Sequence, residues 1–222
     1  MNTSYLDWAA TAPPYEDILK ESTEHAIREF GNPSSAHAAG RAARTILDNS
    51  RARLAEALAC LPERIVFTSG GSEADTIVLL SVLNSRGPRS IVISAIEHSA
   101  IHEQATALES LGVEVIRVKP ERTGLVSPES VAEALRPDTV LVSIMAVNNE
   151  TGAIQPLAEI STAVRSAMAR KPPLLHTDAV QALGKIAFNP SAIGFDAASF
   201  SAHKLGGPRG VGALYLARSI EV

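Results

Sequence analysis

The chain has 222 residues, of which 45% are hydrophobic and 20% charged, a composition typical of a globular protein that buries a core. Its formal net charge of -4 and its lack of a basic run argue against nucleic acid as a partner. The N-terminus shows no signal-peptide pattern, and no run of about 18 apolar residues could span a membrane. The sequence therefore predicts a cytoplasmic protein that does not contact a membrane.

In chain order, residues 13–30 and 34–59 read as two helices joined by a turn, "GNPSS". They precede every strand-like run, so residues 1–60 are predicted to form a helical lead-in that packs on an α/β domain of residues 61–222. The chain has a single cysteine, Cys60, at the end of the second helix. We therefore expect no internal disulfide and no metal site, and Cys60 reads as a small buried apolar residue.

From residue 64 onward, apolar runs alternate with amphipathic stretches. This rhythm predicts an α/β fold, a mostly parallel central sheet with helices on both faces. Ser127 and Pro128 are typical of the start of a helix, and Leu157, Ile160, Val164 and Met168 form one apolar stripe on the next. The predicted strands lie within residues 64–69, 90–95, 113–118, 139–147, 173–179, 195–201 and 212–217.

Ligands of open α/β sheets bind beyond the carboxyl ends of the strands, so polar residues that follow apolar runs are candidate site residues. The first group is "FTSGGSEAD", where Gly70 and Gly71 follow a strand and Ser72 opens a helix. Glycines permit a close backbone approach, and the free N–H groups of a helix start favour an anion such as phosphate. An ordinary strand-to-helix turn capped by Ser72 explains the same residues.

The next two groups are "HTDAVQALGK" and "EHSA". Asp178 could pair with a protonated ring nitrogen and Gln181 could donate to a neighbouring oxygen, although a helix cap with a solvated glutamine fits equally. His98 could lie flat against an aromatic ring, or it could be a structural histidine at a strand end.

The last group is "SFSAHKLGGPRGVG". Ser201 and His203 are two residues apart, so in an extended chain both point to one side and could bind the same anion. Lys204 follows where the strand ends, and a partly desolvated lysine forms a Schiff base with an aldehyde. A solvated lysine beside a glycine turn is the plain alternative. All of these groups together describe the needs of one ligand, pyridoxal 5'-phosphate.

The motifs "YLDWAAT", "GNPSSAH", "FTSGGSEAD", "EHSA", "VNNETG", "HTDAVQALGK" and "SFSAHKLGGPRGVG", in this order, resemble those of the cysteine desulfurases of the class V aminotransferase family. The resemblance implies the large domain of the fold type I pyridoxal phosphate enzymes. It implies that Lys204 binds the cofactor covalently and moves the substrate's Cα proton, that Asp178 pairs with the ring nitrogen, and that His98 stacks on the ring and takes part in catalysis. The other cofactor-binding residues that it implies are Gln181 and Asn149, near the phenolic oxygen, and Gly71, Ser72, Ser201 and His203, at the phosphate.

The resemblance also implies the reaction, in which L-cysteine becomes L-alanine and its sulfur passes to a thiolate as a persulfide. A homodimer, a sulfur-acceptor or scaffold protein, and a role in iron–sulfur cluster assembly are further implications. Two departures are visible. Ala146 stands where members of the family often carry a histidine, and the small C-terminal domain, which carries the sulfur-accepting cysteine, is absent from these 222 residues. Cys60 does not match that cysteine by position.

Two alternatives stay open at this point. One keeps the fold and cofactor but changes the reaction, to that of a selenocysteine lyase or another class V lyase or aminotransferase. The other is a fragment without catalytic activity that acts as a scaffold or binds a partner, since a domain cut at this point exposes apolar surface.

Overall fold

The computed structural model describes residues 4–217, and its centre is a seven-stranded sheet with the order β1-β7-β6-β5-β4-β2-β3. The strands β2 to β6 run parallel to one another, whereas β7 pairs antiparallel with β6 and β1. The mostly parallel sheet is confirmed, and every predicted strand-like run contains one strand. The strands are β1 Ile65–Thr68, β2 Ser90–Ser94, β3 Glu114–Val118, β4 Thr139–Ser143, β5 Leu174–Asp178, β6 Ala197–Ser201 and β7 Gly212–Leu216.

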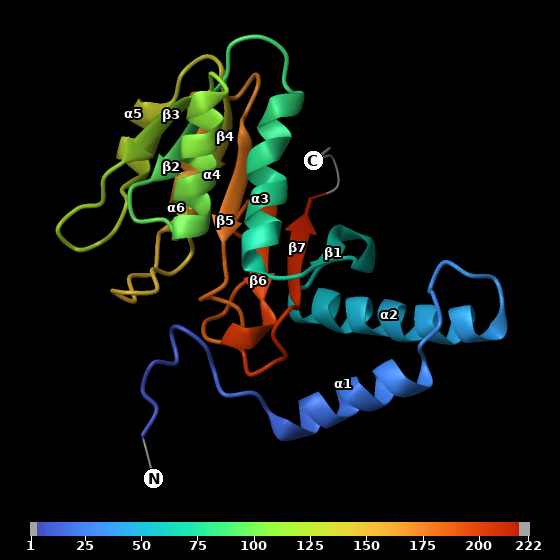
Figure 1. The fold of residues 1–222 in the computed structure, drawn as a ribbon. Coiled ribbons are helices and arrows are strands. Elements are labelled where there is room, and N and C mark those ends of the chain that lie inside the picture. Colours follow the sequence, from blue (N-terminus) through green and yellow to red (C-terminus); the bar gives the residue numbers. More distant parts are fainter. Residues whose placement is uncertain (1–3, 218–222) are drawn as a thin grey trace.

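Helices cover both faces of the sheet, as predicted. Figure 1 shows α3 and α4 lying across one face of the strands, and the hydrophobic clusters place α5, α6 and the end of α2 against the other. The α-helices are α1 Glu16–Arg28, α2 Ala38–Ala57, α3 Gly71–Ser81, α4 Ser99–Ser110, α5 Pro128–Ala134 and α6 Leu157–Ala167. Short 3₁₀ turns are η1 Pro62–Arg64, η2 Val82–Asn84 and η3 Ala202–Lys204.

The two faces of the sheet carry separate apolar cores, because successive side chains of a strand point to opposite faces. In β2, Ile91 and Ile93 pack with α3 and α4, whereas Val92 packs with α5 and α6. All five residues of β2 are buried. A strand buried on both faces reads as a continuous apolar run, which is why the inner strands were visible in the sequence.

The predicted helix signals hold in α5 and α6. The Ser127 side chain accepts the N–H of Ser130 at the start of α5, with Pro128 in the first helical position. In α6, Leu157, Ile160 and Val164 are buried, while Met168 is the C-cap and only half-buried.

The N-terminal helices pack unequally on the sheet. The end of α2 buries Ala55, and Leu58 follows in the same core, but α1 buries none of its residues within the described chain. The segment before α1 contacts a segment near the other end of the chain, where Ala12 N–H donates to His203 O at 2.9 Å. The boundary at residue 60 between a helical lead-in and an α/β domain stays a prediction. The prediction that no element follows β7 concerns residues 218–222, which lie outside the described chain.

Among residues 4–217, no helix combines the length and apolar character needed to cross a membrane.

Candidate functional site

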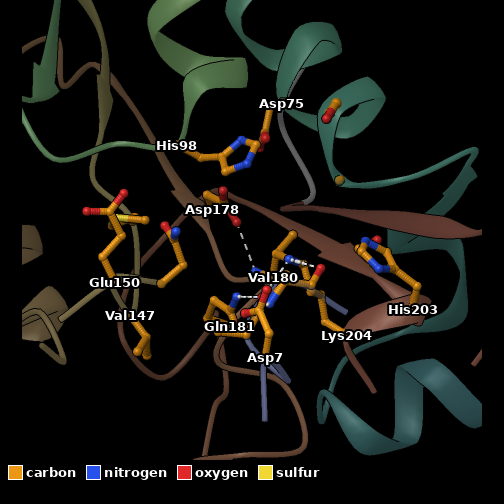
Figure 2. Close-up of a pocket in the computed structure, with 17 residues that line it drawn as sticks. Asp7, Asp75, His98, Val147, Glu150, Asp178, Val180, Gln181, His203 and Lys204 are labelled. Atoms are coloured by element: carbon orange, nitrogen blue, oxygen red, sulfur yellow. Dashed lines mark hydrogen bonds between the residues drawn. The ribbon is translucent and has the colours of Figure 1, made fainter. Parts of the chain in front are cut away.

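A cavity of about 670 Å³ lies at the carboxyl ends of the parallel strands, and every site residue predicted from the sequence lines it. Figure 2 shows His98, Asp178 and Lys204 around this cavity, where they come from the start of α4, from β5 and from η3. The predicted residues are Gly71, Ser72, His98, Asn149, Asp178, Gln181, Ser201, His203 and Lys204; the cavity adds Asp7, Ala9, Ala10, Asp75, Met145, Val147, Glu150 and Val180.

Lys204 is the last residue of η3, directly after β6, and it is half-buried at the cavity wall. Its Nζ donates to the carbonyl oxygens of Ala9 at 2.7 Å and Ala10 at 2.8 Å. Burial lowers the pKa of Lys204, and the negative charges of Asp178 and Asp7 partly oppose this shift. A lowered pKa increases the neutral fraction of the amine, the form that attacks an aldehyde.

Asp178 closes β5 and is 6% exposed. Its Oδ1 accepts the N–H of Val180 at 2.9 Å. Burial raises its pKa, while the Val180 N–H and then the charges of His98 and Lys204 act in the opposite direction. A cation bound beside this carboxyl would stabilise its ionised form.

The start of α3 forms an anion-binding end of the cavity. No side chain caps the helix at Gly70 among the described residues, so the first N–H groups of α3 face the site. A Cβ on Gly71 would lie 2.6 Å from Val180 Cγ2, so only glycine lets the helix start approach so closely. Ser201 and His203 line the same end, and His203 Nδ1 lies 3.0 Å from Thr11 Oγ1.

His98 is the N-cap of α4, and its Nδ1 accepts the N–H of Ala100 at 3.1 Å. This is the cap that a structural histidine would provide, and the ring also lines the cavity, so its stacking on a cofactor ring stays a prediction. Figure 2 shows the ring near Asp178 and Asp75.

The two amide residues have different surroundings. Gln181 Nε2 donates to Ala9 O at 2.8 Å, and Lys185 Nζ donates to Gln181 Oε1. Asn149 lines the cavity, whereas its neighbour Asn148 holds the following turn by accepting the N–H of Thr151 at 2.9 Å.

Ala146, the departure from the family pattern, and Cys60, the single cysteine, both lie outside the cavity lining. Ala146 is buried in the core between Met145 and Val147, which do line the cavity. Cys60 is half-buried against the core, so the prediction of a buried side chain is only partly met, and burial raises the pKa of its thiol. A raised pKa keeps the thiol protonated and unreactive.

Sequence reasoning missed the N-terminal segment and Asp75. Ala9 and Ala10 meet Lys204 across a separation of 195 and 194 residues, which no local pattern reveals. Asp75 is 1% exposed and lies one helical turn after Gly71, on the same face of α3. That spacing from the glycine turn was a readable signal.

Comparison with known proteins places the chain in a family. The model of the class V aminotransferases matches residues 4–222. The chain belongs to this family. It is 39% identical to the cysteine desulfurase IscS of Dictyoglomus turgidum over 98% of its length, and 41% identical to the putative cysteine desulfurase NifS of Bacillus subtilis over 96%. It spans 55% and 53% of these two relatives, slightly more than half of each.

Solved structures agree in fold. A NifS-like protein superposes with a TM-score of 0.94 at 36% identity, over 98% of this chain and 60% of its own. The structure described as SspA in complex with cysteine superposes with a TM-score of 0.91 at 34% identity, over 96% of this chain and 61% of its own. The resemblance to cysteine desulfurases and the fold type I large domain are thereby confirmed.

Class V aminotransferases and cysteine desulfurases are pyridoxal phosphate enzymes, so this is the cofactor of the family to which the chain belongs. The residues of the cavity fit that cofactor. One wall carries a lysine amine with a lowered pKa, the floor carries a buried carboxyl, and an uncapped helix start lies at the other end.

Proposed function

We propose that this chain is the cofactor-binding part of a pyridoxal phosphate-dependent cysteine desulfurase acting on L-cysteine. The observation that carries the proposal is the shared cavity of Lys204, Asp178 and the start of α3. The desulfurase relatives support it, as does the presence of cysteine in the complex of SspA. Because the chain spans little more than half of these relatives, turnover belongs to the proposal.

The cofactor would be held from several sides. Lys204 would bind it covalently, and Asp178 would pair with its ring nitrogen, where a charged carboxylate stabilises a protonated ring. His98, which lines the cavity, would pack on the ring. The remaining predicted contacts are Gln181 and Asn149 near the phenolic oxygen, and Gly71, Ser72, Ser201 and His203 at the phosphate.

When bound, the cofactor withdraws electrons from the substrate's Cα, which makes the Cα proton acidic and prepares the loss of sulfur. Lys204 would move that proton, because its lowered pKa favours the neutral amine that accepts a proton.

Lys204 must also give up its present partners. Its Nζ donates to two carbonyl oxygens of the N-terminal segment, Ala9 and Ala10, and Gln181 donates to Ala9 as well. Attachment of the cofactor would therefore release Lys204 from this segment. Ala9 and Ala10, whose carbonyl oxygens accept from Lys204, line the cavity and would help to bound the substrate site.

The sulfur acceptor is not assigned to this part of the protein. The chain has one cysteine, Cys60, and it does not line the cavity. We infer that the accepting thiol comes from outside these 222 residues, from another segment or from a partner protein. The homodimer, the cytoplasmic location and the role in iron–sulfur cluster assembly stay predictions.

Borohydride trapping tests the cofactor site. Pyridoxal phosphate is added, the adduct is reduced and the labelled lysine is located by peptide mass. We expect the label on Lys204 and its loss in Lys204→Ala. Lys185→Ala is the matched control, because Lys185 contacts Gln181 and burial also lowers its pKa.

A label on Lys185 or on no lysine would contradict the proposed site. Turnover is assayed separately, by alanine and sulfide released from cysteine with a small thiol as the sulfur acceptor. Release of alanine from selenocysteine alone would favour the selenocysteine lyase alternative.

A further inference from the structure

The proposed function does not use two buried polar residues at the cavity, Asp75, which lines it, and His176, which contacts Asp75. His176 and Asp178 are two residues apart on β5, so both side chains point toward α3, where Asp75 meets them. Figure 2 shows Asp75 beside His98 and Asp178 at one end of the cavity. Asp75 is 1% exposed and His176 is fully buried.

The hydrogen bonds of His176 are made by serine hydroxyls. Its Nδ1 lies 2.8 Å from Ser143 Oγ and its Nε2 lies 2.9 Å from Ser199 Oγ. Asp75 Oδ1 lies 3.5 Å from His176 Nε2, and it has no hydrogen-bond partner among residues 4–217. Burial lowers the pKa of His176 to about 3, so the imidazole is neutral and supplies no positive charge to Asp75.

A charged carboxylate in this position would be unfavourable. A fully buried charge without a paired cation costs several kcal/mol, and such groups keep their proton instead. Burial raises the pKa of Asp75 well above its usual range, and the nearby charge of Asp178 raises it further, while a hydrogen bond with the Ser199 side chain acts in the opposite direction. Glu97, on the loop before His98, is also buried, and its Oε2 has no partner in the described chain.

We propose that Asp75 keeps its proton beside the neutral His176, so that the negative charge of this buried group rests on Asp178. The inference rests on the proposed function, in which Asp178 pairs with the ring nitrogen of the cofactor. In a buried site the ionisation of one carboxyl disfavours the ionisation of its neighbour, so a neutral Asp75 leaves the charge to Asp178, which lines the cavity together with Asp75 and Lys204. The titratable groups that face Asp75 and Asp178 are His176 on β5, Glu97 and His98 before α4, and Lys204 on η3.

Infrared spectroscopy of the cofactor-free 222-residue chain tests where the proton lies. At neutral pH we expect a carbonyl stretch from a protonated carboxylic acid that is lost in Asp75→Asn, shifts in D₂O and remains in Asp178→Asn. Glu97→Gln removes a separate component, because burial raises the pKa of Glu97 to about 8. A component that is lost in Asp178→Asn and remains in Asp75→Asn would overturn the proposal.

Cofactor binding supplies the second readout, as the pyridoxal phosphate concentration that half-saturates the chain. Asp178→Asn removes the charge and is expected to weaken binding by about tenfold or more. Asp75→Asn keeps a neutral polar head and is expected to weaken binding less, while Asp75→Ala weakens it more than Asp75→Asn does. Equal losses in Asp75→Asn and Asp178→Asn would mean that Asp75 carries charge, against the proposal.

The two proposals fail separately. If no lysine of the unmutated chain is labelled by pyridoxal phosphate, the proposed function fails, while the infrared result still decides the state of Asp75. If Asp75→Asn does not fold, ¹³C-carboxyl aspartate labelling of Asp178→Asn replaces it. One aspartate carboxyl that stays protonated through neutral pH is then the expected result, and none is the contradicting one.

Discussion

Helices α1 and α3 have different relations to the rest of the molecule. α1 is amphipathic and carries exposed ion pairs one turn apart, Lys20 with Glu16 and Arg28 with Glu24, yet it buries nothing within the described chain. α3 is apolar on most sides, and both the sheet and α4 cover it. The amphipathic pattern of α1 therefore marks where a helix lies, whereas the burial of a helix depends on what the rest of the chain places beside it.

This difference bears on the site. Asp75 and Gly71 of α3 reach the cavity because the helix is held against the sheet, so the site depends on the core beneath it. Ile27 of α1 is 71% exposed, and neighbouring Phe30 is 80% exposed. Substitutions in the two regions should therefore have unequal consequences.

The largest expected effect comes from a matched pair of truncations. Leu141→Ala in β4 removes a fully buried side chain and should lower the free energy of unfolding by about 2–5 kcal/mol. Ile27→Ala on α1 should change it by less than about 0.5 kcal/mol, because that side chain is mostly exposed. Urea denaturation of both variants measures the difference. Equal losses of unfolding free energy in the two variants would show that α1 is packed in solution, against the difference between α1 and α3.

The second expected effect is the pH dependence of the free energy of unfolding that buried Glu97 contributes. Burial raises the pKa of Glu97 from 4.5 to about 8. Between these two values the folded chain retains a proton that the unfolded chain has released, so Glu97 makes stability fall as pH rises and has no further effect above the folded pKa. Relative to Glu97→Gln, the unmutated chain should lose a few kcal/mol between about pH 5 and about pH 8.5.

Denaturation curves at several pH values measure this loss, and the variant serves as the reference for every other titrating group. Parallel curves for the two proteins would show that Glu97 is ionised in the folded chain. Burial of Glu97 would then add no pH dependence to stability, and in this respect the region around α3 would not differ from exposed α1.

The smallest expected effect is the difference between alanine substitutions at two adjacent glycines, Gly70 and Gly71. Gly71→Ala would place a Cβ 2.6 Å from Val180 Cγ2 and should cost about 1–3 kcal/mol of stability. Gly70→Ala is the control, since no atom lies within 4 Å of its added Cβ. The concentration of pyridoxal phosphate that half-saturates the chain should rise in Gly71→Ala more than in Gly70→Ala. The reverse order would contradict the close approach of α3 to Val180.

The strands and the main site residues could be predicted because they leave local signals. Strands of a parallel sheet are buried on both faces and appear as apolar runs, and their polar ends mark the cavity. Asp178, Ser201 and Lys204 each follow such a run and were found in this way. Ser127 and Pro128 marked the start of α5 by the same kind of short-range chemistry.

Other features depend on contacts between distant residues and had no local signal. The hydrogen bonds from Lys204 to Ala9 and Ala10 join the two ends of the chain. The isolation of α1 could not be read from its amphipathic pattern, because that pattern predicts a buried stripe without naming what covers it.

The sequence by itself determined the order of strands and helices and the residue types at the ends of the strands, because hydrophobic periodicity and turn chemistry act over a few residues. Only the tertiary structure decided that Asp75 and His176 lie behind Asp178 and that the N-terminal segment reaches Lys204. Burial and the resulting pKa shifts arise from groups that the fold brings together across the sheet, and their charges interact through space rather than along the chain.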